Sequence, residues 1–296
     1  MNKNFIYRPV CEVCGSKENK IIFTRAFTDP SVWNFLERYY ENRIPIDLFE
    51  NVDYEIKKCP DCEFIWQSYI LNNELLGELY ENWISKEQSL DKSNSYSDVD
   101  ESSLRRQMFV IKKLLNKKDI NVLDYGMGWG KWCMAAKNYG FNVFGYEISE
   151  ERTSFAKNNG INVINDYKKI KDHKFDFINS EQVFEHINNP AETLNYLFTA
   201  LNPGGYIRIS VPNGRNIEKE FKNSNWTAGK NALHPLEHIN CFNYQSLRKL
   251  GQLSGLKYIK QPILIENNTL VDLIKGKLGS MLRQYSGTCL YFKFGE

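Results

Sequence analysis

Short apolar runs alternate with stretches of helical periodicity between residues 120 and 212. The runs are rich in Val, Ile, Phe and Tyr, which is typical of buried strands. The stretches between them carry helix signals, such as Pro190 at a start and Asn202-Pro203-Gly204-Gly205 at an end. This alternation indicates a parallel sheet with helical crossovers. The first predicted strand ends at residues 122–123. The others cover residues 142–146, 162–164, 175–179 and 206–211.

The pattern predicts further elements on both sides of this region. Helices are expected at 132–139, from Ser149, and at 190–201, 245–253 and 270–282. Strands are expected at 256–265 and 289–294. Upstream, a predicted helix precedes a polar, Ser/Asp-rich segment at 85–103, and one face of that helix carries Leu76, Leu79, Tyr80 and Trp83. That segment indicates a mobile loop or lid.

Residues 122–130 read Val-Leu-Asp-Tyr-Gly-Met-Gly-Trp-Gly, where a predicted strand meets a predicted helix. Glycine has no Cβ, so the chain can turn sharply and a ligand can touch bare backbone. The first N–H groups of the following helix would point into the same turn. The pattern therefore predicts a nucleotide site.

Two phosphate-binding fingerprints do not fit this loop. The dinucleotide pattern Gly-x-Gly-x-x-Gly needs a glycine where Lys131 stands, and a P-loop needs Ser or Thr where Trp132 stands. The remaining pattern, Asp-x-Gly-x-Gly-x-Gly, resembles the first motif of class I S-adenosylmethionine-dependent methyltransferases. Leu-Asn-Pro-Gly-Gly before the fifth strand is also typical of that family. The resemblance runs from about Val110 to the C-terminus.

The resemblance implies a Rossmann-like α/β fold with a doubly wound, mostly parallel seven-stranded sheet, whose last strand is antiparallel and lies between its neighbours. It implies that Asp124 holds the ammonium of S-adenosylmethionine, Glu147 the ribose hydroxyls and Asp166 the adenine amine. A glycine turn without a ligand and a solvated Glu147 are the alternatives. The full predicted cofactor set is Asp124, Tyr125, Gly126, Gly128, Gly130, Glu147, Ile148, Asp166, Asn179 and Ser180.

Two Cys-x-x-Cys hooks, Cys11–Cys14 and Cys59–Cys62, stand in the first 68 residues. Each hook places two thiolates on one turn, and two hooks complete a tetrahedral zinc site. A redox pair or unligated thiols are the alternatives, although neither hook lies on the βαβ pattern of a redox site. Seven cysteines without a secretory signal favour the reducing cytoplasm, and no segment is long and apolar enough to cross a bilayer.

The charge distribution argues against nucleic acid as the zinc module's partner. Residues 1–100 carry 11 basic and 18 acidic side chains, a net charge of −7. An acidic module repels phosphates. It is therefore expected to be a folding or docking element that also covers the substrate entrance. Basic residues near the C-terminus could attract a phosphorylated or nucleotide-linked acceptor; they are Lys257, Lys260, Lys275, Lys277 and Arg283.

A hydroxyl acceptor needs a base, and three of the four histidines are candidates. His238 is predicted as the base and His186 as the second candidate, with Glu237 orienting a histidine. His173 lies in a charged turn and is expected to be solvated. The acceptor pocket is expected to be lined by Trp226, His234 and Phe242.

Metal chemistry is an open alternative at two of these positions. In quinone O-methyltransferases, a carboxylate three residues before the glutamate of a Glu-His pair helps bind a divalent metal. The same position before Glu185-His186 is Gln182, with Glu181 one residue away. His234 and His238 also have a helical metal-ligand spacing, which Pro235 makes less suitable.

The sequence thus predicts a zinc-binding module at 1–68, a helical linker and lid at 69–104, and a methyltransferase domain at 105–296. This arrangement resembles sugar methyltransferases of antibiotic and surface-polysaccharide pathways. Carbon methylation is disfavoured, because such enzymes usually carry a further large C-terminal domain. A sugar hydroxyl or amine is therefore the expected acceptor, and a homodimer is one expected assembly. A nucleic-acid methyltransferase or binding protein and a non-catalytic nucleoside-binding scaffold are the alternatives.

Overall fold

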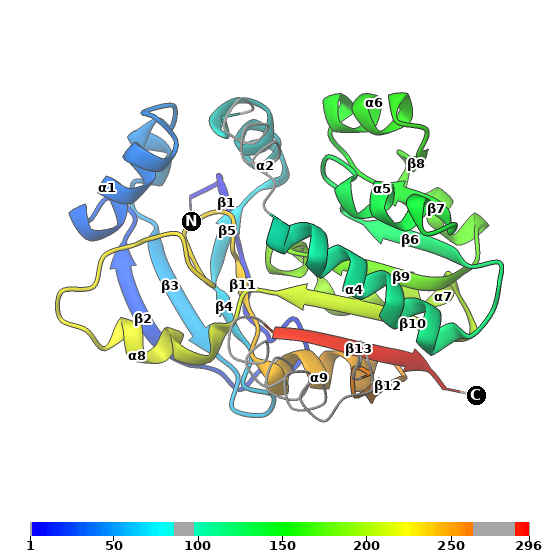
Figure 1. Cartoon of the computed structure of the whole chain (residues 1–296). Coiled ribbons are helices and arrows are strands. Elements are labelled where there is room, and N and C mark those ends of the chain that lie inside the picture. Colours follow the sequence, from blue (N-terminus) through cyan, green and yellow to red (C-terminus); the bar gives the residue numbers. More distant parts are fainter. Residues whose placement is uncertain (1, 86–97, 263–287, 296) are drawn as a thin grey trace. The chain divides into compact units, whose positions relative to one another are not determined.

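A computed structural model describes residues 2–85, 98–262 and 288–295 of the 296-residue chain (Figure 1). The chain divides into two compact units. The N-terminal unit comprises Met1–Asn94, Glu185–Asn189 and Pro212–Lys249, and the sheet unit comprises Ser95–Phe184, Pro190–Val211 and Leu250–Glu296. This grouping differs from the linear boundaries expected after residues 68 and 104, because two later segments pack with the N-terminal residues.

The sheet unit contains a seven-stranded sheet in the order β12-β13-β10-β9-β6-β7-β8. Strands β10, β9, β6, β7 and β8 run parallel, whereas β13 pairs antiparallel with both β12 and β10. The predicted antiparallel last strand between its neighbours is therefore confirmed. The strands are β6 (Asn121–Tyr125), β7 (Asn142–Tyr146), β8 (Asn162–Ile164), β9 (Phe175–Glu181), β10 (Leu201–Val211), β12 (Leu256–Ile259) and β13 (Thr288–Phe294).

Helices of this unit pack on the strands through apolar side chains. Helix α5 contacts β6, β7 and α4, and α6 contacts β8. A buried cluster that includes Met108, Val122, Trp132 and Phe177 forms the core. The helical elements are α4 (Asp98–Leu115), α5 (Lys131–Asn138), α6 (Glu150–Asn158), η3 (Tyr167–Asp172), α7 (Pro190–Thr199) and α9 (Tyr244–Leu253), the last of which begins in the N-terminal unit.

The N-terminal unit has a four-stranded antiparallel sheet in the order β11-β4-β3-β2 and a β1–β5 pair. Its strands are β1 (Phe5–Tyr7), β2 (Lys20–Ala26), β3 (Asp53–Lys58), β4 (Ile65–Gln67), β5 (Tyr69–Leu71) and β11 (Asn240–Cys241). Its helical elements are α1 (Pro30–Tyr39), η1 (Ile46–Phe49), α2 (Asn73–Glu78), η2 (Leu79–Trp83), η4 (Phe184–His186, which begins in the sheet unit), η5 (Gly214–Asn216) and α8 (Ile217–Phe221).

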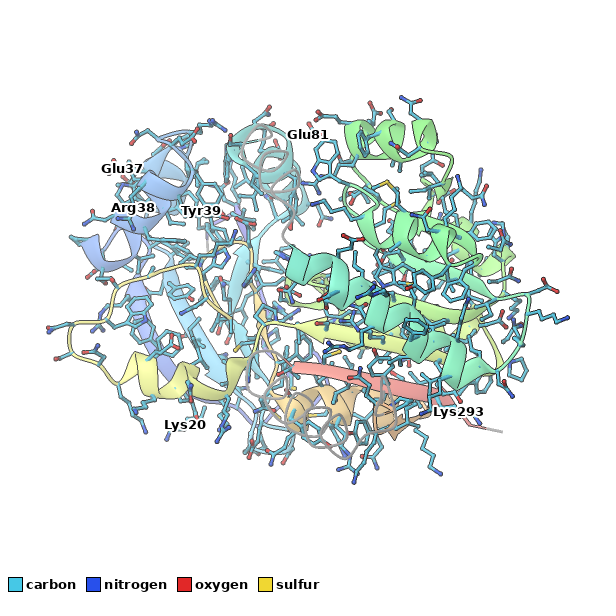
Figure 2. The ribbon with its side chains drawn as sticks, in the orientation of Figure 1. Lys20, Glu37, Arg38, Tyr39, Glu81 and Lys293 are labelled. Atoms are coloured by element: carbon cyan, nitrogen blue, oxygen red, sulfur yellow. The ribbon has the colours of Figure 1, made fainter. Side chains whose placement is uncertain are left out.

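Helix α1 shows why this unit has a core of its own. Asp29 caps its N-terminus by accepting from the Ser31 backbone N–H, and Pro30 suits the first turn. The helix buries Phe35 among the aromatic side chains of the unit, while its Glu37 and Arg38 are exposed (Figure 2). The apolar cluster of this unit also takes in Phe221 and Leu233 from the later segment.

Several predicted elements differ from the structure. The strand expected at 175–179 continues to Glu181, and the helix expected to end at residue 201 ends at Thr199, where β10 follows. The loop expected at 85–103 is wrong at its end, because α4 begins at Asp98. Residues 86–97 and the helix expected at 270–282 lie outside the described residues. Within the described part of the chain, no helix could span a membrane.

Candidate functional site

The glycine loop joins β6 to α5 in the sheet unit. Gly126, Gly128 and Gly130 all adopt positive φ angles, 79°, 54° and 74°, which other residues rarely adopt. A Cβ on Gly126 would strike Val183, whereas a Cβ on Gly128 would meet nothing within 4 Å. The loop thus needs Gly126 for packing, and at Gly128 it leaves open space beside bare backbone.

Glu147 follows β7 and faces this loop. Its carboxylate accepts hydrogen bonds from the backbone N–H groups of Gly128 (3.0 Å), Ile148 (2.9 Å) and Ser149 (3.0 Å). Arg152 adds an ion pair at 3.8 Å. The predicted ribose-binding carboxylate is therefore held directly against the loop, next to the open space at Gly128.

Asp124 lies at the buried end of a polar chain across three strands. The Asn179 side-chain amide donates to Asp124 Oδ1 at 2.7 Å, and the Arg208 guanidinium donates to Asn179 Oδ1 at 2.7 Å. Arg208 also pairs with Glu181. Burial raises the pKa of Asp124 to about 7, partly offset by the hydrogen bond from Asn179.

Apolar and aromatic side chains surround the ends of β6 and β7. Ile148 is 69% exposed, which is unusual for a large apolar residue and suits a face that a flat ring would cover. Tyr125 stacks on Tyr146 at 5.1 Å between ring centroids. Asp166 is exposed and caps η3 by accepting from the Lys168 N–H. The remaining predicted cofactor residue, Ser180, is fully buried.

The four hook cysteines lie together in the N-terminal unit. Cys11 Sγ is 3.5 Å from Cys62 Sγ, and Cys14 Sγ is 3.6 Å from Cys59 Sγ. All four sulfurs lie within 4.8 Å of one another. Sulfur atoms held tetrahedrally about 2.3 Å from a zinc ion would be about 3.8 Å apart. The cluster therefore fits a structural zinc ion, and the four thiols form no disulfide.

The three histidines that the sequence suggests for the acceptor side lie together in the N-terminal unit. The ring centroids of His234 and His238 are 4.1 Å apart, and those of His186 and His238 are 4.9 Å apart. Burial lowers the pKa of His186 to about 3 and that of His238 to about 4, so both imidazoles are neutral at pH 7. His173, in the sheet unit, lies against the ring of Phe144.

The hydrogen bond of His238 fixes its tautomer. His238 Nδ1 is 2.6 Å from the Asn231 carbonyl oxygen. A carbonyl only accepts, so Nδ1 carries the proton and Nε2 has the lone pair. His238 can therefore accept a proton at Nε2. Ligand atoms of Glu185, His186 and His238 also lie within 4.8 Å of one another, so the metal alternative at His186 remains geometrically open.

Three buried side chains that the sequence did not single out hold this region. The Tyr40 hydroxyl donates to Glu237 at 2.9 Å. The Gln67 amide donates to the carbonyls of His234 and His238. Arg8 contacts the segments after His186 and His238. Their partners lie more than a hundred residues away in sequence, and no local motif marks them.

The two predicted pocket walls take part in packing. Trp226 lies 4.4 Å from the ring of Phe23 and stacks on Tyr54, within the apolar cluster of the N-terminal unit. Phe242 is 1% exposed and contacts Phe64. A role for either ring as a wall of an acceptor pocket stays a prediction.

The comparisons with known proteins point to one family, whose match includes residues of the sheet unit and the two later segments of the N-terminal unit. Residues 102–261, slightly more than half of the chain, match the methyltransferase domain family. Cyclopropane-fatty-acyl-phospholipid synthase of Escherichia coli (strain K12) is 28% identical over 127 residues, 41% of this chain and 32% of that protein. Ubiquinone biosynthesis O-methyltransferase of Hydrogenovibrio crunogenus is 22% identical over 113 residues, 35% and 47% of the two chains. The chain thus spans 32% and 47% of these two relatives' lengths.

Solved structures show the same fold. The plantazolicin methyltransferase BpumL in complex with SAH aligns with a TM-score of 0.51 at 18% identity, over 75% of this chain and 94% of that one. The plantazolicin methyltransferase BamL aligns with a TM-score of 0.51 at 14% identity, over 76% and 96%. At these identities, the likeness concerns the fold alone.

Proposed function

Because the chain belongs to the methyltransferase domain family, we propose that it transfers a methyl group from S-adenosylmethionine to a hydroxyl or amine of a small polar acceptor, in particular a sugar or sugar nucleotide. The observation that carries this proposal is the glycine loop. Its three glycines have positive φ angles, and open space at Gly128 adjoins the carboxylate of Glu147.

The residues of the sheet unit suit the parts of the methyl donor. S-adenosylmethionine supplies a methyl group already activated on a sulfonium. Asp124 would hold its ammonium, Glu147 its ribose hydroxyls, and the backbone at Gly128 would allow close approach. Ile148 would cover one face of the adenine, and Asp166 would accept from the adenine amine.

The histidines of the N-terminal unit supply the acceptor-side chemistry in this proposal. His238 presents a lone pair at Nε2, which suits removal of a proton from an acceptor hydroxyl. Glu237, held by Tyr40, adds a carboxylate that can accept from a second hydroxyl. Polar groups of this kind suit a hydroxyl-rich acceptor such as a sugar. A relative named as an O-methyltransferase is in line with an oxygen nucleophile.

The Cys11, Cys14, Cys59 and Cys62 thiolates would hold a structural zinc ion. Such a site is closed, because all four positions are taken by protein ligands, so zinc has no direct part in methyl transfer. Its role would be to join the two hooks and thereby stabilise the N-terminal unit.

Calorimetry with S-adenosylhomocysteine tests the donor site. A side chain at Gly128 would occupy the open space, so Gly128→Leu should weaken binding by on the order of 100-fold or more. Gly140→Leu is the matched control: Gly140 also has a positive φ (81°) and open space, but it follows α5. It should carry the same backbone strain and keep its affinity. Equal affinity of the Gly128 variant and the wild type would rule out this donor site.

A mass assay with a trideuteromethyl donor tests the acceptor. The protein is incubated with a panel of nucleoside diphosphate sugars, and addition of a labelled methyl group identifies the acceptor. His238→Ala should then lose most turnover while S-adenosylhomocysteine binding persists. Full turnover by that variant would remove His238 as the base. Salt-dependent RNA binding with no sugar product would favour the nucleic-acid alternative.

A further inference from the structure

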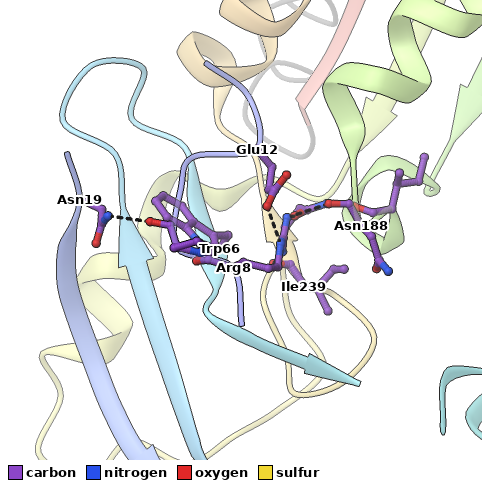
Figure 3. A network of polar contacts seen from close by, with 9 residues as sticks. Arg8, Glu12, Asn19, Trp66, Asn188 and Ile239 are labelled. Atoms are coloured by element: carbon purple, nitrogen blue, oxygen red, sulfur yellow. Dashed lines mark hydrogen bonds and ion pairs between the residues drawn. The ribbon is translucent and has the colours of Figure 1, made fainter. Parts of the chain in front are cut away.

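Arg8 is a buried cation that contacts three separate segments of the N-terminal unit. Its side chain is 3% exposed. Nε pairs with Glu12 at 3.3 Å, and the two terminal nitrogens donate to the carbonyl oxygens of Ile239 (3.3 Å) and Asn188 (3.1 Å) and to Asn240 Oδ1 (2.8 Å). Figure 3 shows the guanidinium of Arg8 between Glu12 and Asn188.

The partners of Arg8 lie close in sequence to a hook cysteine or to a histidine. Glu12 stands between Cys11 and Cys14 of the first hook. Asn188 lies two residues after His186, and Ile239 directly follows His238. One guanidinium thus joins a metal-binding hook to both histidine-bearing segments.

The second hook is also connected to the histidine segments. Three residues after Cys62 the chain enters β4, which pairs with β11 through Trp66 and Asn240. Gln67, at the end of β4, donates from Nε2 to the carbonyls of His234 (2.8 Å) and His238 (2.9 Å). Strand β4 also contacts Arg8 directly, because Trp66 Nε1 donates to the Arg8 carbonyl oxygen.

The chemistry of arginine suits this position. A planar guanidinium offers five donors in a fixed fork, so it can satisfy several acceptors at once, whereas an ammonium is a single point charge. Burial lowers the pKa of Arg8 to about 10, and Glu12 opposes this shift, so the group stays charged at neutral pH. Without Arg8, the part-buried Asn188 carbonyl and Asn240 Oδ1 each lose a donor, whereas the Ile239 carbonyl keeps the Gln67 backbone N–H.

We propose that Arg8 is a positioning residue that couples the cluster of four hook cysteines to His186 and His238, so that the metal-binding hooks set the geometry of the acceptor-side histidines. The importance of these histidines rests on the proposed function. The coupling itself rests on the contacts of Arg8 and holds whichever acceptor the protein takes. The zinc-binding hooks then help to position the histidines of the acceptor side.

Imidazole ¹⁵N spectra of the full-length, zinc-loaded protein test this coupling. The chain has four histidines, and His173 in the sheet unit serves as an internal reference. Arg8→Met should shift the signals of His186 and His238 and leave that of His173 unchanged. Arg8→Lys should give intermediate shifts, because it restores the charge without the fork. Arg25→Met, at an exposed arginine on β2 of the same unit, is the matched control and should shift none of the four.

Zinc content and donor affinity separate positioning from general damage. Both Arg8 variants should retain zinc and bind S-adenosylhomocysteine like the wild type, because the glycine loop belongs to the other unit. Once the acceptor is identified, the kcat of Arg8→Met should fall by a larger factor than its KM for the acceptor rises. Wild-type positions for His186 and His238 in zinc-loaded Arg8→Met would overturn the proposal.

If Arg8→Met does not fold, Glu12→Gln tests the same coupling. Glu12 is half-buried at the surface, and glutamine has nearly the same shape. With zinc bound, this variant should still shift His186 and His238, because it removes the charge that links Arg8 to the first hook. Unchanged histidine signals would show that the hook and the histidines are not coupled. Failure of the wild type to bind S-adenosylhomocysteine would instead reject the proposed function and leave the histidine readout intact.

Discussion

The ligand-binding role proposed for Asp124 comes with a cost to folding. It is 4% exposed, and burial raises the pKa of its carboxyl from 3.8 to about 7. The folded state therefore holds this proton more tightly than the unfolded state does. Ionisation of Asp124 therefore lowers the free energy of unfolding as pH rises from about 4 to about 7. Above that range the full destabilisation is present. A shift of this size corresponds to about 4 kcal/mol.

We predict opposite effects of Asp124→Asn on stability and on binding. The variant should gain stability relative to the wild type as pH rises from 5 to 8, because no buried charge forms. It should also bind S-adenosylhomocysteine on the order of 10- to 100-fold more weakly at pH 8, since the ammonium loses a carboxylate. Urea unfolding and calorimetry across this pH range measure the two effects.

The control for this prediction is Asp119→Asn, at an exposed position just before β6. It should change neither the pH dependence of stability nor the affinity. The wild type should bind more tightly as pH rises through 7, as Asp124 ionises. An affinity in the wild type that does not change between pH 6 and pH 8 would contradict a direct role for this carboxylate.

At the scale of elements, the contact between α9 and β13 depends on the absence of one side chain. Gly251 lies in α9 against the ring of Phe292 in β13, and a Cβ there would overlap the ring. Phe292 is fully buried and cannot move aside without disturbing its neighbours. The glycine therefore lets the helix approach the antiparallel strand of the sheet.

Gly251→Ala should destabilise the protein by about 1–3 kcal/mol, as is typical of overpacking. The matched control is Gly77→Ala in α2, where a Cβ meets nothing within 4 Å. That substitution should be neutral or stabilise by up to about 1 kcal/mol, because alanine favours the helix. Chemical denaturation compares the two. A stabilised Gly251 variant would show that α9 and β13 pack less closely than described.

At the scale of the whole molecule, the two units have separate apolar cores. The cluster around Phe27, Phe49 and Tyr54 draws on residues of the N-terminal unit, and the cluster around Val122 and Phe177 draws on residues of the sheet unit. The four hook cysteines belong to the first of these units, and the glycine loop belongs to the second. Loss of the metal should therefore affect the units unequally.

Cys59→Ser should lower the protection of the N-terminal unit against hydrogen exchange and leave the sheet unit protected. Binding of S-adenosylhomocysteine should persist, whereas methyl transfer should fail. Cys241→Ser is the control, because Cys241 is buried in the same unit but stands outside the hooks. Hydrogen exchange resolved by peptide provides the measurement. Equal loss of protection in both units would mean that they do not fold separately.

Much of the sheet unit could be predicted because its signals are local. The strands at 142–146 and 162–164 and the cap at Ser149 follow from short-range patterns, and the structure has them at the same residues. The Asn-Pro-Gly-Gly segment correctly predicts a helix stop, since α7 ends at Thr199, but β10 begins at Leu201 and not after this segment. Leu201 and Tyr206 pair with β9, but the register shifts between them, so the Asn-Pro-Gly-Gly residues form an irregularity in which Gly204 has a positive φ angle.

The sequence alone determined the donor-type glycine loop, the two cysteine hooks and the alternation of strands and helices, because each depends on residues a few positions apart. Only the tertiary structure decided that 185–189 and 212–249 pack with the N-terminal residues and that Arg8, Tyr40 and Gln67 hold the histidine segments. Arg8 and Ile239 are 231 positions apart. Such contacts depend on how buried donors and acceptors pair after the chain has folded, which local patterns do not encode.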